Sequence, residues 1–273
     1  MKTVLLPFGK VAPVELVAEE AELATEGGRV AELAVAKQFP EGARAVTRVV
    51  AVDPLRLESE RILSPGASAP HGVPYKMLRT QVLRRLDKLG VNSLAVVGTA
   101  ADTGKTLTAI NLAITIAADP ERTALLVDFD LRKPSIHRRF GIEVEVGVED
   151  CLRGRLPLQE VLLRPAGYER LVLLPARERS LDSSELLSSR RTQELMLEMR
   201  SRYRDRVLVV DLPPVLQADD ALAFARHMQA VLVVVGEGRT RRVDLLRTLE
   251  LLGDVPIVGT VLNGTREAVN VYY

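Results

Sequence analysis

The sequence has no tryptophan, one cysteine and three histidines, and aromatic residues make up only 4% of its 273 residues. A single cysteine, Cys151, excludes an intramolecular disulfide and a cysteine zinc cluster, and three scattered histidines argue against a histidine metal site. The net charge of +1 gives no reason to expect nucleic acid or an acidic membrane surface as a partner. The short basic run at 239–242 is interpreted as the solvated start of a helix.

Long apolar runs are also missing. No stretch approaches the roughly 18 uninterrupted apolar residues that a membrane span needs, and the apolar-leaning run before Gly9 is too short for a signal peptide. We therefore expect a cytoplasmic protein without direct membrane insertion. Any recruitment to the inner face of a membrane would come through a partner.

Residues 1–72 differ in composition and in residue pattern from the rest and are interpreted as an N-terminal extension. They contain an acidic, alanine-rich stretch at 14–35, a short expected strand at 45–52, and a segment rich in proline and glycine at 64–70 that is typical of a linker. A partner-binding arm and a mobile tail both remain open for this extension.

From Tyr75 onward, apolar runs of strand length alternate with helix-length segments. The runs are nearly continuous, which is typical of strands buried on both faces of a parallel sheet. Helices are expected at 105–118, 185–202 and 243–252. This pattern predicts an α/β fold with a doubly wound, mostly parallel sheet, whose ligand lies at the carboxyl ends of the strands. The expected strands are 94–97, 124–127, 171–174, 207–210, 231–235 and 257–262.

A phosphate-binding loop is expected directly after the first of these strands. The loop, residues 99–106, ends in Gly104-Lys105-Thr106 and leads into a helix. Its backbone N–H groups and the helix N-terminus would face phosphate oxygens. Lys105 would reach the β- and γ-phosphates, and the Thr106 hydroxyl would bind Mg²⁺. Thr99 stands where the usual pattern has Gly or Ala.

Two aspartate motifs also follow expected strands. Residues 128–132 read Asp-Phe-Asp-Leu-Arg, and residues 211–214 read Asp-Leu-Pro-Pro. An aspartate at the carboxyl end of a buried strand, beside a phosphate-binding loop, is a common way to hold Mg²⁺ and its waters. Three motifs in order, each at a strand end, favour a P-loop NTPase fold.

With these motifs, the sequence from about Tyr75 to the C-terminus resembles the bacterial tyrosine kinase family. That family has a Walker A loop, a second Asp-x-Asp-x-Arg motif and a Walker B strand ending in Asp-x-Pro-Pro. Further matches lie at 110–113, 185–189 and 261–263. The sequence is most similar to the stand-alone cytoplasmic autokinases of exopolysaccharide and exosortase systems.

The resemblance implies transfer of a phosphoryl group from ATP to a tyrosine hydroxyl, with ATP and Mg²⁺ bound. It implies a kinase domain at 73–263 and a C-terminal tyrosine tail at 264–273. The catalytic candidates are Lys105, Asp128 and Asp130, and the metal-binding candidates are Thr106, Asp128 and Asp211. The nucleotide-binding candidates are Thr103, Gly104, Lys105, Thr106, Leu107 and Asn263, with Asn263 expected at the adenine. The acceptors are Tyr272 and Tyr273.

The partner that the resemblance implies is a polysaccharide chain-length-determinant membrane protein acting as activator. The function would be regulation of exopolysaccharide synthesis and export. Self-association stays open, because the family's Glu-x-x-Arg-x-x-Arg assembly motif falls on Val73, Lys76 and Arg79 and lacks its acidic residue.

Two alternatives remain. Asp102 puts a negative charge in the loop where backbone should close on phosphates, which favours a non-catalytic nucleotide-binding regulator. A partitioning or cell-division-type ATPase switch is the other alternative. Such switches carry a second lysine at the position of Ala100, and this sequence does not.

Overall fold

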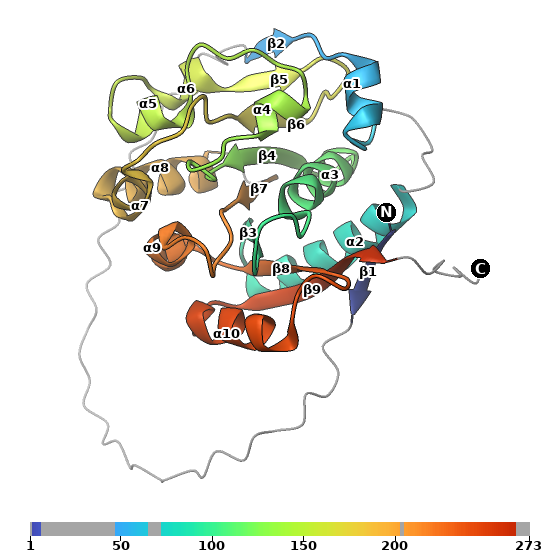
Figure 1. Cartoon of the computed structure of the whole chain (residues 1–273). Coiled ribbons are helices and arrows are strands. Elements are labelled where there is room, and N and C mark those ends of the chain that lie inside the picture. Colours follow the sequence, from blue (N-terminus) through green and yellow to red (C-terminus); the bar gives the residue numbers. More distant parts are fainter. Residues whose placement is uncertain (1, 7–46, 65–71, 203–204, 266–273) are drawn as a thin grey trace, which may run out of the picture. The chain divides into compact units, whose positions relative to one another are not determined.

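The computed structural model describes residues 2–6, 47–64, 72–202 and 205–265. Within them, nine strands form one sheet (Figure 1). Across the sheet the order is β1 (Lys2–Leu6), β9 (Ile257–Thr265), β8 (Val231–Gly236), β3 (Ser93–Gly98), β7 (Arg206–Asp211), β4 (Thr123–Asp128), β6 (Leu171–Leu174), β5 (Leu163–Pro165) and β2 (Arg48–Val50).

The six strands from β9 to β6 are mutually parallel. From β3 the chain moves toward one edge of the sheet through β4, β5 and β6, and it then returns to form β7 between β3 and β4. It next forms β8 and β9 on the opposite side of β3, toward the other edge. This confirms the predicted doubly wound, mostly parallel sheet, and the six predicted strands all form. The expected strand at 45–52 forms as the three-residue β2, while β1 was not predicted.

The core lies on both faces of the sheet because successive side chains of a strand point to opposite sides. In β3, Leu94 and Val96 join one core cluster, and Ala95 and Val97 join the other. The first cluster is completed by side chains of α1 (Pro54–Ser59), α2 (Gly72–Leu89), α3 (Lys105–Ala117) and α4 (Ile136–Arg139).

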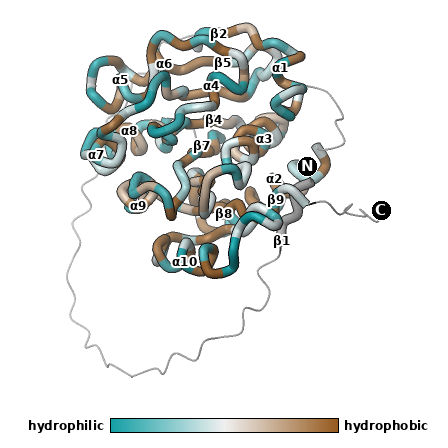
Figure 2. The backbone as a smooth tube through the Cα atoms, in the orientation of Figure 1, coloured by the Kyte–Doolittle hydropathy of each residue, from teal (hydrophilic) through white to brown (hydrophobic). Residues whose placement is uncertain are grey.

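The opposite face carries the second cluster. Its helices are α5 (Val148–Leu152), α6 (Leu158–Val161), α7 (Ser183–Ser188), α8 (Arg190–Ser201), α9 (Asp220–Phe224), followed by the 3₁₀ turn η1 (Ala225–His227), and α10 (Arg242–Leu252). Figure 2 shows α10 alternating between hydrophobic and hydrophilic positions, as expected for a helix with one face on the sheet.

The helix predicted over 185–202 is divided into α7 and α8. The break lies at Ser189, whose backbone is extended (φ −69°, ψ 157°). Its hydroxyl accepts a hydrogen bond from the N–H of Thr192 at 3.2 Å, which caps the start of α8. The helical pattern runs through both helices, so the pattern alone did not reveal the cap.

The expected boundary at residue 72 does not coincide with a division of the structure. Residues 47–63 belong to the same compact unit as the sheet, and Leu57 and Ile62 are buried in its core. Asn111 of α3 accepts a hydrogen bond from the N–H of Leu63 (2.9 Å) and donates one to the carbonyl of Arg61 (3.0 Å). The alanine-rich stretch at 14–35 lies outside the described residues.

Within the described ranges, no helix combines the length and the apolar character needed to cross a membrane.

Candidate active site

The loop between β3 and α3 lies at the carboxyl edge of the sheet. Asp102 and Gly104 both have left-handed backbone conformations, with φ values of 58° and 86°. In the described part of the chain, the N–H groups of residues 102–106 donate no hydrogen bond. These free donors, together with the N-terminus of α3, form a cradle for an anion such as phosphate.

Lys105 begins α3 and is 8% exposed. Its amine lies 2.6 Å from Oδ2 of Asp130 and 3.6 Å from Oδ1 of Asp211. Burial alone would lower the pKa of Lys105, but the two carboxylates outweigh burial and raise it. The amine is therefore charged and held between two carboxylates, one just after the end of β4 and one at the end of β7.

Asp211 ends β7 and is fully buried. Its Oδ2 accepts a 2.6 Å hydrogen bond from the hydroxyl of Thr106, while its Oδ1 has no hydrogen-bond donor. Burial raises the pKa of Asp211, against the opposing effects of Lys105 and Thr106. A buried carboxylate oxygen without a donor, next to a threonine hydroxyl, is suited to hold Mg²⁺ through the water molecules around the ion.

No group of three or more His, Cys, Asp or Glu side chains forms a metal cage in the described residues. A magnesium ion at Thr106 and Asp211 would therefore take its remaining ligands from phosphate and water, as is usual for this ion.

Asp128 and Asp130 differ in their surroundings. Asp128 is fully buried, and its Oδ2 accepts hydrogen bonds from the N–H groups of Ser135 and Ile136, each at 3.0 Å. Burial and the nearby Asp211 raise the pKa of Asp128 to about 8, despite these backbone bonds. Asp130 instead lines the cavity over the loop. Asp128 thus holds the turn after β4, and Asp130 faces the space where a ligand would lie.

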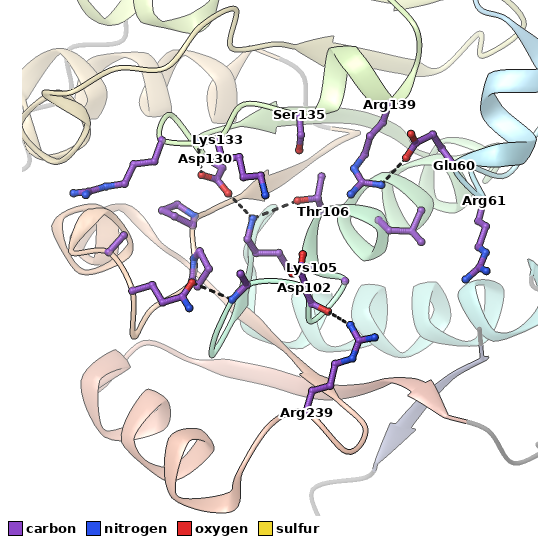
Figure 3. A pocket seen from close by; sticks show the side chains of 18 of the residues that line it. Glu60, Arg61, Asp102, Lys105, Thr106, Asp130, Lys133, Ser135, Arg139 and Arg239 are labelled. Atoms are coloured by element: carbon purple, nitrogen blue, oxygen red, sulfur yellow. Dashed lines mark hydrogen bonds and ion pairs between the residues drawn. The ribbon is translucent and has the colours of Figure 1, made fainter.

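A cavity of about 590 Å³ opens over the loop (Figure 3). Of the predicted site residues, Gly104, Lys105, Thr106, Leu107 and Asp130 line it. Six cationic side chains and three carboxylates contribute to its wall, a formal net charge of +3 that suits a polyanionic ligand. The cations are Arg61, Lys105, Arg132, Lys133, Arg139 and Arg239, and the carboxylates are Glu60, Asp102 and Asp130.

Thr103, which belongs to the loop, and Asn263 are not among the residues that line the cavity. Asn263 is 3% exposed, and its amide nitrogen donates a 2.9 Å hydrogen bond to the carbonyl of Thr103. A Cβ atom at Gly104 would lie 1.9 Å from that amide nitrogen, so only glycine fits there. Asn263 was expected to contact adenine, but in the structure its side chain binds the phosphate-binding loop. Tyr272 and Tyr273 lie outside the described residues.

Several cavity residues were not predicted from the sequence, and three of them make notable contacts. Glu60 and Arg139 form an ion pair at 2.8 Å. Arg239 donates a hydrogen bond to the carbonyl of Asp102 at 3.2 Å. Arg239 belongs to the basic run that was interpreted as a solvated helix start, and no pattern in the sequence could have separated it from its exposed neighbours. The residues around Glu60 lie before the region of resemblance.

Comparison with known proteins gave no matching family model. Among curated proteins, the tyrosine-protein kinase ptk of Acinetobacter johnsonii is 28% identical over 190 residues, which are 69% of this chain and 25% of that protein. The tyrosine-protein kinase YwqD of Bacillus subtilis is 26% identical over 228 residues, which are 82% of this chain and 89% of that protein. This chain thus spans a quarter of the first relative and most of the second.

Solved structures agree with these relatives. The kinase domain of the Escherichia coli tyrosine kinase ETK superposes with a TM-score of 0.67 at 26% identity, covering 76% of this chain and 81% of that one. In sequence and in fold, the chain is similar to the bacterial tyrosine kinases. This similarity agrees with the three strand-end motifs, which the structure brings to one edge of the sheet.

The cell-division ATPase alternative finds support in the fold only. The septum site-determining protein MinD of Pyrococcus horikoshii, solved with Mg-ADP, superposes with a TM-score of 0.51 at 21% identity, over 62% of this chain and 68% of that one. Both families therefore share a P-loop nucleotide-binding fold with this chain. The two curated relatives described above are tyrosine-protein kinases and not division ATPases.

Proposed function

We propose that this chain is an ATP-dependent protein-tyrosine kinase that phosphorylates its own C-terminal tyrosines. The observation that carries the proposal is the meeting of Lys105, Thr106, Asp130 and Asp211 under a cationic cavity. ATP is the phosphoryl donor, and a bound Mg²⁺ would neutralise phosphate charge and orient the phosphates. Thr106 and Asp211 are the residues that would hold it.

Lys105 changes partners in this mechanism. Without ligand its amine pairs with Asp130, and with ATP it would bind the β- and γ-phosphates. The N–H groups of residues 102–106 would take the remaining phosphate oxygens. The chain thus acts mainly by positioning and by neutralising charge, as expected for phosphoryl transfer.

Release from Lys105 leaves Asp130 facing the cavity. Asp130 is the better candidate for accepting the proton of the incoming tyrosine hydroxyl, because the Oδ2 atom of Asp128 is already occupied by two backbone N–H groups. Asp128 would act on the reaction through the turn that it holds, near the metal. Asn263 would support the loop, and any contact with adenine would be additional.

The proposed acceptors are Tyr272 and Tyr273 in the segment 264–273. The ten residues after Asn263 can extend to roughly 33 Å at about 3.3 Å per residue, which permits transfer to a neighbouring copy. We propose transfer between molecules, regulation of exopolysaccharide synthesis and export, and activation by a chain-length-determinant membrane protein that recruits the kinase to the inner face of the membrane. The N-terminal extension, residues 1–72, is the proposed partner-binding part.

A mixing experiment tests the reaction. Lys105→Ala protein with an intact tail is mixed with active protein that lacks residues 272–273, and phosphotyrosine is mapped by mass spectrometry. Label on the inactive copy, at a rate that rises with protein concentration, supports transfer between molecules. A concentration-independent rate in the wild type means transfer within one molecule.

The same experiment separates the kinase from the nucleotide-binding regulator. If wild-type protein binds MgATP and neither it nor the mixture is labelled, even with the cytoplasmic part of the membrane partner present, the kinase proposal is wrong. The non-catalytic regulator then becomes the better interpretation.

A further inference from the structure

Two successive carbonyl groups of the phosphate-binding loop are held by side chains from neighbouring strands. Arg239, in the turn after β8, donates to the carbonyl of Asp102 at 3.2 Å. Asn263, near the end of β9, donates to the carbonyl of Thr103 at 2.9 Å. Gly236 and Asn263 are paired in the parallel ladder of β8 and β9, so both donors come from one corner of the sheet. Figure 3 shows Arg239 reaching across to the loop.

The conformation of the loop explains why such donors matter. Between Gly98 and Gly104 the loop has no glycine, yet Asp102 adopts a left-handed φ of 58°. That conformation is unfavourable for residues with a Cβ atom, although Asp tolerates it better than most. In this conformation the carbonyl of Asp102 accepts the hydrogen bond from Arg239.

Arg239 is suited to hold this conformation. It has no acidic partner within 4 Å among the described residues, while Arg241, two positions later, forms a two-point ion pair with Asp244 at 2.8 Å. Arg239 lines the cavity, and Arg241 does not. A guanidinium hydrogen bond to a carbonyl is stronger than one between neutral groups, so losing it should loosen the loop.

We propose that Arg239 is a positioning residue for nucleotide binding. It fixes the carbonyl of Asp102 outward, so that the N–H groups of residues 102–106 converge on the phosphate site before the ligand arrives. A loop that is already ordered loses less conformational entropy when the nucleotide binds, so its affinity for the nucleotide is higher. The inference rests on the proposed nucleotide site, and it adds a residue that the phosphate-binding motif itself does not contain.

The loop can be examined directly in the protein without ligand. Amide ¹⁵N relaxation and heteronuclear NOE are measured for Thr103 and Gly104 in wild type, Arg239→Ala and Arg241→Ala. We expect lower order at both amides in Arg239→Ala alone, with an unchanged melting temperature. Equal order at these amides in wild type and Arg239→Ala would overturn the proposal.

Calorimetry with MgADP provides the second readout. We expect Arg239→Ala to bind about five- to thirtyfold more weakly, a smaller loss than that of a direct phosphate contact, because this charge-assisted hydrogen bond is exposed and acts through the loop. Arg239→Lys should recover part of this loss, and Arg241→Ala should match wild type. Weaker binding with unchanged loop order would mean that Arg239 contacts the phosphates directly and would contradict positioning. If wild type itself does not bind MgADP, the proposed nucleotide site fails, while the relaxation data still decide whether Arg239 orders the loop.

Discussion

The hydroxyl of Thr106 and Oδ2 of Asp211 are joined by a 2.6 Å hydrogen bond across 105 positions of sequence. This bond ties the first turn of α3 to the end of β7 and leaves Oδ1 of Asp211 without a donor. Without magnesium, we expect Asp211→Asn to bind ADP about as well as wild type. Added Mg²⁺ should increase the affinity of the variant only slightly, because a neutral amide interacts poorly with Mg²⁺ and its bound waters. Calorimetry with MgCl₂ and with EDTA checks this. An undiminished Mg²⁺ effect would contradict the metal assignment.

Lys105→Ala should weaken MgADP binding about ten- to a hundredfold. The change removes one charge-assisted contact to phosphate, worth roughly 1.5–3 kcal/mol. Lys88→Ala is the matched control, since Lys88 is an exposed lysine at the end of α2. Equal affinities of Lys105→Ala and wild type would remove the loop from the nucleotide site.

Asp102→Gly should bind MgATP more tightly than wild type, by about three- to tenfold. Glycine adopts the observed positive φ without penalty, and one negative charge leaves the cavity wall. Asp102→Asn separates the two effects, because asparagine also tolerates this conformation but is neutral. Unchanged or weaker affinity in Asp102→Gly would show that Asp102 does not weaken the site.

Asn111→Ala should lower the free energy of unfolding by about 2–4 kcal/mol. The substitution leaves the N–H of Leu63 and the carbonyl of Arg61 without partners in a largely buried place. Urea denaturation measures the loss, and Asn92→Ala is a comparison at a part-buried asparagine that also donates to backbone carbonyls. A loss below about 1 kcal/mol would mean that residues 61–63 are held mainly by their apolar side chains.

Cys151 should react very slowly with thiol reagents in the folded protein. Its side chain is buried, and burial raises the pKa of the thiol to about 12. Because the thiolate is the reactive form, reaction near pH 8 must await opening of the structure. Measured with a chromogenic disulfide, the rate should rise sharply in denaturant. Fast modification under native conditions would show that the helix α5 opens readily.

How far the sequence leads can be seen at the strand ends. Continuous apolar runs predicted the six central strands, because a strand buried on both faces has no polar side to alternate with. The Gly-Lys-Thr loop and the two aspartate motifs predicted one site, since the carboxyl ends of parallel strands meet at one edge. Lys105, Thr106, Asp130 and Asp211, whose side chains meet in the structure, were predicted in this way.

Tertiary structure alone decided the rest. β1 is a short edge strand whose pairing partner, β9, is distant in sequence, so no local pattern marked it. The roles of Asn263 and Arg239 depend on contacts across 160 and 137 positions. Local sequence fixes which residues can bond, while the crossing order of the strands decides which of them meet. The phosphate-binding loop can thus be predicted from the sequence, whereas the side chains that hold its conformation are known only from the tertiary structure.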